Sequence, residues 1–274
     1  MSINLMLVTS NPDSIIEAQE AGIDRIFFDL EYINKAERQR GRDTLILHND
    51  IEDILKLRKI VTKSELLVRV NALYPYSKEE IDKAISYGAD IIMLPMVIDA
   101  EDVRTLVKYV DKRAKVMPMI ETAQSVARID DILEIEGIDE IFIGLNDLHI
   151  SMGLTFMFEL LSGGIVEYLS EKITKKGIKF GFGGMARIGE GILPAECILA
   201  EHYRLKSSSV ILSRTFRNEV GENREKVDLI SEVSKIRKQE EFIKTWKEED
   251  FESNKLFVKE KVKEIIDLIN SKAN

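Results

Sequence analysis

The sequence has a single cysteine and no long apolar run. Cys197 alone cannot form an intrachain disulfide, so we expect the chain in a reducing compartment, the cytoplasm. No apolar run approaches the roughly 18–20 residues that a membrane-spanning helix requires. Residues 1–13 lack a basic start, and their apolar run is too short for a secretory signal. These absences predict a cytoplasmic protein without a membrane partner.

Positive charge is scarce relative to negative charge. The chain has 39 lysine and arginine residues against 48 aspartate and glutamate residues, a formal net charge of −9. Because nucleic-acid binding needs a basic surface, no nucleic-acid partner is expected. The sequence does contain 45% hydrophobic and 32% charged residues, enough for a sizeable core beneath a charged surface.

Short apolar runs rich in β-forming residues alternate with amphipathic helical patterns. Most of these runs are solid rather than alternating, which is typical of parallel strands buried on both faces. The predicted strands are residues 3–8, 25–30, 66–70, 91–95, 115–120, 140–144, 179–183 and 209–213. The predicted helices are residues 12–21, 50–63, 77–87, 99–110, 123–135, 156–176 and 194–206.

Eight strand–helix units of about 30 residues predict an α/β fold, a (β/α)8 TIM barrel. The alternative is a doubly wound open sheet. It needs fewer strands and a glycine-rich phosphate loop after the first strand, which residues 7–13, "LVTSNPD", do not supply.

We expect residues 1–218 to form the barrel domain and residues 219–274 to form a C-terminal helical extension. The extension is dense in lysine and glutamate and carries an apolar stripe. Its helices are therefore expected to pack on the barrel or on a neighbouring subunit, and the first of them is a candidate for the eighth barrel helix. A solvated helical tail is the alternative.

Two apolar runs deliver an acid at the same end of the predicted sheet. Glu121 ends the first strand of the pair, in "MIETAQSV" (119–126), and Asp147 lies just past the second, in "IFIGLNDL" (141–148). The C-terminal ends of all barrel strands meet at one mouth, where active sites of this fold lie. Two adjacent carboxylates repel each other unless a cation lies between them. They are therefore predicted ligands of a divalent metal, Mg²⁺ first, with Mn²⁺ or Co²⁺ as alternatives; helix capping is the competing role.

Further charged residues follow the second and third predicted strands. "FFDLEY" (27–32) places Asp29 and Glu31 at the mouth, and "LVRVN" (67–71) places Arg69 there. A buried arginine beside carboxylates is either a structural ion pair or an anion-binding group. This gathering of acids around one arginine exceeds what helix capping needs.

Five segments, in this order and spacing, resemble the HpcH/HpaI aldolase and citrate lyase β-subunit family. They are "FFDLEY" (27–32), "VRVN" (68–71), "ADIIMLPMVIDAEDV" (89–103), "MIETAQSV" (119–126) and "EIFIGLNDLHISMG" (140–153). The resemblance implies a metal-dependent (β/α)8 barrel that makes or breaks carbon–carbon bonds next to an enolate derived from pyruvate or an acyl-CoA. It also implies a homo-oligomer, a trimer or hexamer.

The resemblance also implies roles for residues of this chain. Glu121 and Asp147 match the metal ligands, Arg69 the arginine that stabilises the enolate, and Glu31 an acid behind the ligands. The aldolases of the family carry a histidine for proton transfer where this chain has Tyr32, whose unperturbed pKa of about 10 makes it a poor base. The proton carrier is therefore open between Tyr32, His149 and a metal-activated water oriented by Glu31.

The segments after the last two predicted strands form a candidate anion site. In barrels, loops at this place often bind phosphate. Gly183 and Gly184 would let backbone N–H groups approach an anion, and Arg187 and Arg214 would add positive charge. Such a site would imply a phosphorylated or multiply acidic substrate. The alternative is that the glycines only permit a tight turn.

The favoured function is a divalent-metal-dependent aldolase or lyase of class II type, acting on a 2-oxo acid through a pyruvate-type enolate. Arg69 would donate charged hydrogen bonds to the enolate oxygen. Two alternatives stay open: a citrate-lyase-like acyl-CoA lyase, for which no adenine or pantetheine signature is found, and a barrel that binds an oxo acid without turnover.

Overall fold

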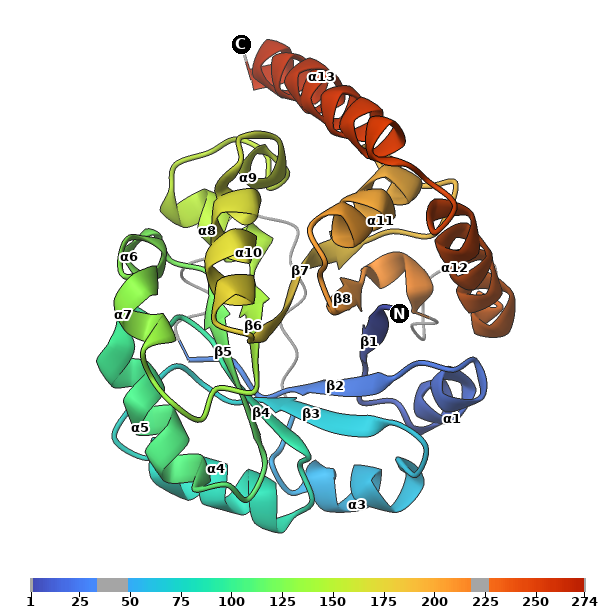
Figure 1. Cartoon of the computed structure of the whole chain (residues 1–274). Coiled ribbons are helices and arrows are strands. Elements are labelled where there is room, and N and C mark those ends of the chain that lie inside the picture. Colours follow the sequence, from blue (N-terminus) through green and yellow to red (C-terminus); the bar gives the residue numbers. More distant parts are fainter. Residues whose placement is uncertain (1, 34–48, 218–226, 274) are drawn as a thin grey trace.

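The computed structural model describes residues 2–33, 49–217 and 227–273, and its centre is a closed barrel of parallel strands (Figure 1). Each strand pairs with the next, and the last pairs with the first. The strands are β1 (Asn4–Val8), β2 (Arg25–Asp29), β3 (Glu65–Arg69), β4 (Ile91–Leu94), β5 (Lys115–Ile120), β6 (Glu140–Ile143), β7 (Lys179–Met185) and β8 (Ser209–Leu212). The predicted (β/α)8 barrel is confirmed, and the open sheet is excluded.

Helices surround the barrel on its outer side (Figure 1). They are α1 (Pro12–Glu20), α3 (Asp53–Ile60), α4 (Ser77–Ser86), α5 (Ala100–Val110), α6 (Ala123–Ala127), α7 (Ile129–Leu133), α8 (Leu145–Ser151), α9 (Glu159–Ser162), α10 (Ile165–Lys175), α11 (Ala195–Arg204), α12 (Leu229–Ile243) and α13 (Glu248–Ala273), with a 3-10 helix, η1 (Arg214–Phe216), after β8. None of the described helices is long and apolar enough to cross a membrane.

Two predicted helices are each divided in the structure. The segment 123–135 forms α6 and α7, which meet at Arg128. The segment 156–176 forms α9 and α10, separated by Gly163 and by Gly164, whose φ of 86° leaves the helical region. One helix, α8, was not predicted. It begins directly after β6 and carries Asp147 in its first turn.

The strands bury side chains on both faces, as their solid apolar runs predict. One set of alternate residues fills the barrel interior, and the other packs outward against the helices. The interior set is rich in methionine and consists of Met6, Phe27, Leu67, Ile91, Met93, Met117, Met119 and Phe142. This packed interior separates the two ends of the barrel.

A buried ion-pair network closes the barrel at the N-terminal ends of its strands. Arg25 at the start of β2 pairs with Glu140 at the start of β6, at 2.8 Å, and with Glu65 at the start of β3, at 3.0 Å. The hydroxyl of Ser209, at the start of β8, donates to the same Glu140 carboxylate at 2.5 Å. The network therefore joins strands from opposite sides of the barrel floor.

The helix α12 lies between α1 and α11, the place of the eighth barrel helix (Figure 1). Glu240 of α12 accepts the N–H of Ile3 at 2.8 Å, and Arg237 pairs with Asp24 at 3.0 Å, so this helix fixes the start of β1. The expected boundary between residues 218 and 219 lies outside the described residues.

The helix α13 runs along the outside and packs one face on α9 and α11 (Figure 1). Its side chains Val258, Val262 and Ile265 are buried. Asn254 donates to Glu201 of α11 at 2.9 Å. Within the chain, α13 thus contacts the outer helix layer of the barrel.

Candidate active site

Glu121 follows β5 directly and is buried at the C-terminal end of the barrel, with 2% of its surface exposed. Its Oε1 accepts the backbone N–H of Met96, in the loop after β4, at 2.8 Å. Its Oε2 lies against Gly144 at the end of β6, where a Cβ would collide with it. Glycine at position 144 is therefore what allows this carboxylate to lie between β5 and α8.

Asp147 lies in the first turn of α8 and is half-buried. Burial, and then the charges of Asp147 and Glu31, together raise the pKa of Glu121 to about 8, while Arg69 opposes them. The structure thus brings together the carboxylates expected to bind a metal. Their mutual repulsion is large enough to oppose the ionisation of one of them.

Arg69 ends β3 and makes a two-pronged ion pair with Asp29 at the end of β2. Its Nε and Nη2 donate to the two oxygens of Asp29 at 2.9 and 2.8 Å, and Nη2 lies 3.4 Å from Glu31. Among the described residues, the remaining nitrogen, Nη1, has only the sulfur of Met119, at 3.9 Å. Burial alone would lower the pKa of Arg69, but Asp29 and Glu31 raise it well above its usual value. The guanidinium is therefore charged and fixed in orientation.

The two residues that follow Leu30 point in different directions. Glu31 is 1% exposed and faces Arg69, whereas Tyr32 is 51% exposed.

His149 is buried on α8, and its Nδ1 lies 3.2 Å from the carbonyl oxygen of Leu145. Because a carbonyl only accepts, Nδ1 carries the hydrogen and Nε2 is the basic nitrogen.

The residues of the candidate anion site occupy β7 and the segments after β7 and β8. Gly183 has a φ of 63°, and a Cβ there would contact the side chain of Leu145, so this position requires glycine. Gly184 follows in a register shift between β7 and β8. Arg187 pairs with Glu190 at 2.6 and 3.1 Å, and Arg214 is exposed on η1. An anion at Arg187 would compete with Glu190.

The oxygen donors at the mouth fit a hard divalent cation. Arg69 pairs with Asp29 and lies 3.4 Å from Glu31, and it opposes but does not cancel the effects that raise the pKa of Glu121. Within residues 2–33, 49–217 and 227–273, no group of three or more histidine, cysteine, aspartate or glutamate side chains has metal-binding geometry. Two carboxylates completed by water and substrate are a usual arrangement for Mg²⁺.

Asn71 and Glu80 are residues at this end of the barrel to which the sequence assigned no role. Asn71 lies two residues after Arg69, inside the motif "VRVN", and is 1% exposed. Its side chain contacts the backbone that follows Glu31 and the carboxylate of Glu80 on α4. Burial raises the pKa of the Glu80 carboxyl. The sequence signal for this contact was a polar residue just after a buried strand, but the sequence does not indicate which residues it contacts.

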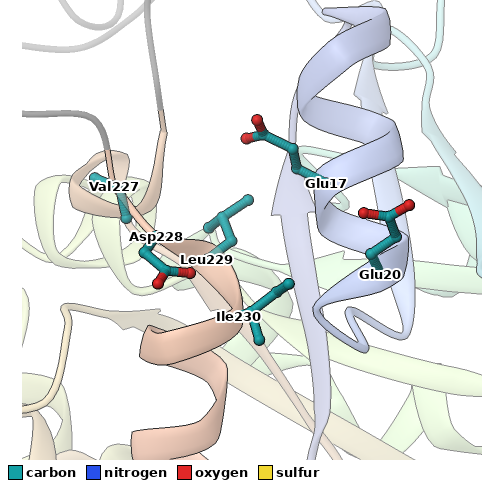
Figure 2. Close-up of a pocket in the computed structure, with 6 residues that line it drawn as sticks. All are labelled: Glu17, Glu20, Val227, Asp228, Leu229 and Ile230. Carbon is teal, nitrogen blue, oxygen red and sulfur yellow. The ribbon is translucent and has the colours of Figure 1, made fainter.

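The cavities lined by described residues include one at the mouth of the barrel and one in the outer helix layer. One, of about 380 Å³, opens beside Tyr32 at the mouth and has walls from the segments after β2 and β3 and from α4. The other, of about 310 Å³, lies between α1 and the start of α12 (Figure 2). Its lining residues are Glu17, Glu20, Val227, Asp228, Leu229 and Ile230. No predicted site residue lines the second cavity.

Two curated proteins are similar to part of the chain. A hydroxypyruvate/pyruvate aldolase of Rhizorhabdus wittichii is 33% identical over 79 residues, 26% of this chain and 32% of that protein. A pyruvate kinase of Methylorubrum extorquens is 33% identical over 97 residues, 35% of this chain and 20% of that protein. The chain thus matches a fifth to a third of the length of these relatives.

Solved structures share the fold over most of the chain. An HpcH/HpaI aldolase from Desulfitobacterium hafniense has a TM-score of 0.59 at 16% identity, covering 90% of this chain and 95% of the other. The citrate synthase SbnG has a TM-score of 0.58 at 21% identity, covering 77% of this chain and 85% of the other. The sequence profile of HpcH/HpaI aldolase/citrate lyase matches residues 3–163, which include β1 to β6 and all four carboxylates around Arg69. The chain belongs to the HpcH/HpaI aldolase/citrate lyase family.

Proposed function

We propose that this protein is a divalent-metal-dependent aldolase or lyase that forms or cleaves a carbon–carbon bond through the pyruvate-type enolate of a 2-oxo acid. The observation that carries the proposal is the set of hydrogen bonds that fixes the guanidinium of Arg69. Two of its nitrogens are fixed on Asp29, and Nη1 has no described partner but the sulfur of Met119, beside the buried carboxylate of Glu121. The partial match to a hydroxypyruvate/pyruvate aldolase supports a 2-oxo acid as substrate.

Glu121 and Asp147 would hold the metal, which is Mg²⁺ in this proposal, with Mn²⁺ and Co²⁺ as alternatives. When bound, a divalent cation supplies a Lewis acid for the carboxylate and keto oxygens of the substrate. The hydrogen bond from Met96 N–H holds Glu121 in one orientation. The buried surroundings of Glu121 would strengthen every charge interaction with the substrate.

Arg69 would stabilise the negative charge that develops on the enolate oxygen. Its pair with Asp29 fixes the guanidinium before the substrate arrives, so little reorganisation is needed as the charge forms. Glu31, held near Arg69, would take part in proton transfer, and Tyr32 and His149 are the further candidates for that step.

The remaining parts of the substrate and the assembly are also proposals. A phosphorylated or multiply acidic substrate would be bound by Gly183, Gly184, Arg187 and Arg214, with loss of the Arg187–Glu190 pair. We propose a cytoplasmic homo-oligomer, a trimer or hexamer, with residues 1–218 as the catalytic domain. Exposed apolar side chains on α13 support an assembly; they are Leu256, Phe257, Leu268 and Ile269.

The test is exchange of the methyl protons of pyruvate in D₂O with Mg²⁺ or Mn²⁺, followed by NMR. We expect exchange that a chelator abolishes. Glu121→Gln and Asp147→Asn should each weaken metal binding, because each removes an anionic ligand. Glu136→Gln, at an exposed glutamate before β6, is the matched control and should behave as the parent protein.

Two outcomes would contradict the proposal. Full exchange by a metal-free Glu121→Gln, Asp147→Asn double variant would exclude these residues as ligands. Pyruvate binding without any proton exchange would favour a barrel that binds an oxo acid without turnover. An acyl-CoA substrate predicts that exchange is seen only with a thioester.

A further inference from the structure

The turn after β2 has three consecutive backbone N–H groups held by side chains. The N–H of Glu31 donates to Oδ1 of Asp29 at 3.1 Å. The N–H groups of Tyr32 and Ile33 both donate to Oδ1 of Asn71 at 3.0 Å. Because Asn71 lies two residues after β3, its side chain holds this turn against the segment that follows the neighbouring strand.

The other side of the Asn71 amide is held as firmly. Its Nδ2 donates to Oε1 of Glu80 on α4 at 2.7 Å, and its backbone N–H lies 3.4 Å from Oε2 of the same carboxylate. Two N–H groups can only donate and an ionised carboxylate can only accept, so the amide of Asn71 has one possible orientation. Asn71 and Glu80 together are called the Asn71–Glu80 clamp below.

We propose that Asn71 is a positioning residue for Glu31, and that Glu80 keeps Asn71 in the required orientation. With the amides of residues 32 and 33 fixed, the chain turns so that Glu31 points inward, 3.4 Å from Arg69, while Tyr32 points outward. Without the clamp, the turn loses the two hydrogen bonds that fix residues 32 and 33, so the backbone no longer holds Glu31 in its place beside Arg69. The role rests on the proposed function, since it matters for turnover only if Glu31 serves the reaction.

A double-mutant cycle on pyruvate proton exchange tests the role. Asn71→Ala should lower kcat about tenfold or more and change KM little, because Glu31 is lost from its place and substrate contacts remain. In a Glu31→Gln background the same substitution should cost less than about twofold, since the group it positions is already gone. Equal losses in both backgrounds would overturn the inference. A wholly structural role would lower the melting temperature without this non-additivity.

Reversing the polarity of the clamp provides a rescue experiment. Asn71→Asp keeps an acceptor for the two N–H groups but sets a carboxylate against Glu80, so exchange should fall. Asn71→Asp combined with Glu80→Gln restores one donor and one acceptor between the side chains and should recover most of the rate. No recovery in a double variant that melts at the parent temperature would contradict the clamp. Glu136→Gln is again the control.

Amide hydrogen exchange tests the clamp independently of activity. The N–H groups of Tyr32 and Ile33 should be protected in the parent protein, exchange at least about tenfold faster in Asn71→Ala, and stay protected in Glu31→Gln. Unchanged protection in Asn71→Ala would overturn the clamp. If pyruvate protons do not exchange in the parent protein, the proposed function fails, while the amide result still decides whether the clamp exists.

Discussion

Arg69 is fixed by two hydrogen bonds to one carboxylate, and only a planar guanidinium can make them while offering a third nitrogen to the mouth. Arg69→Lys keeps the charge but loses this geometry. If Arg69 acts on the enolate as it forms, kcat should fall on the order of 10²–10³-fold with KM nearly unchanged. Steady-state exchange kinetics check this. A change confined to KM would mean that the residue only holds the substrate carboxylate.

Glu31 and Tyr32 differ sharply in exposure, and this difference separates their expected roles. Tyr32→Phe should reduce turnover by about tenfold or less, since an exposed phenol is a poor base at neutral pH. Glu31→Gln should cost about 10²–10⁴-fold, the usual range for a lost acid–base group. An inactive Tyr32→Phe protein that folds and binds metal would make the tyrosine the proton carrier. An inactive His149→Ala protein with normal metal content would assign the step to His149.

The residues at the mouth were predictable where strand geometry alone decides their position. Asp29 and Arg69 end parallel strands and Glu121 directly follows one, so their convergence follows from the barrel topology. The contacts of Asn71 were not predictable, because its partners lie 38 and 39 residues before it and 9 residues after it, and only the fold brings them together.

Strands were easier to predict than helices in this chain. All eight strands appear near their expected ranges, because apolar runs buried on both faces have few alternative interpretations. In the stretch 156–176 the helical spacing of apolar residues continues across Gly163 and Gly164, so the spacing alone predicted one helix. The positive φ of Gly164 divides the stretch into two helices. The short α8 carries too few residues to show a period at all.

The helix α11 contains a buried histidine that should make stability depend on pH. His202 stacks on Phe182 of β7 with ring centroids 3.7 Å apart, and burial lowers its pKa to about 3. Its Nδ1 lies 2.9 Å from the hydroxyl of Ser207, and Nε2 has no partner in the described part of the chain. Below pH 6.5 the unfolded chain therefore binds a proton at this histidine, whereas the folded protein does not until about pH 3. The free energy of unfolding should consequently fall as pH decreases from 6.5 towards 3.

The expected slope is about 1.4 kcal/mol per pH unit within that window. Urea unfolding of the parent and of His202→Gln at pH 7, 6 and 5 would measure it. His202→Gln is less stable at pH 7 but lacks the titration, so its free energy of unfolding should decline less steeply. Parallel curves for the two proteins would show that His202 has the same pKa in the folded and unfolded states, and would contradict the prediction.

At the scale of the whole molecule, the barrel has a charged layer at each end and an apolar, methionine-rich interior between them. At the floor, Glu140 is fully paired with Arg25 and accepts from Ser209. At the mouth, Glu121 faces other carboxylates, and its pKa is raised to about 8. The first arrangement suits stability. The second arrangement places carboxylates close enough to repel one another and lowers the stability of the fold, and a bound cation would relieve that repulsion. Functional sites commonly reduce stability in this way.

The same substitution at the two ends should therefore change stability in opposite directions. Glu140→Gln leaves Arg25 buried without its main partner and should cost about 3 kcal/mol of unfolding free energy, while proton exchange per folded molecule stays near the parent rate.

Glu121→Gln resembles the protonated carboxyl. Between the unfolded pKa of 4.5 and the folded pKa of about 8, the folded protein binds the extra proton, so the parent loses stability as pH rises through this window.

Measured with chelator at pH 8, Glu121→Gln should gain on the order of 1–3 kcal/mol over the parent, and the gain should shrink towards pH 5. If Glu121 is a metal ligand, saturating Mg²⁺ should reverse the order, because the folded parent would then bind the ion more tightly than the variant. Denaturant unfolding of both variants with and without Mg²⁺ gives the comparison. A destabilised Glu121→Gln protein in chelator would mean that this carboxylate is held by partners that satisfy its charge, and the mouth would then be a structural ion-pair network like the floor.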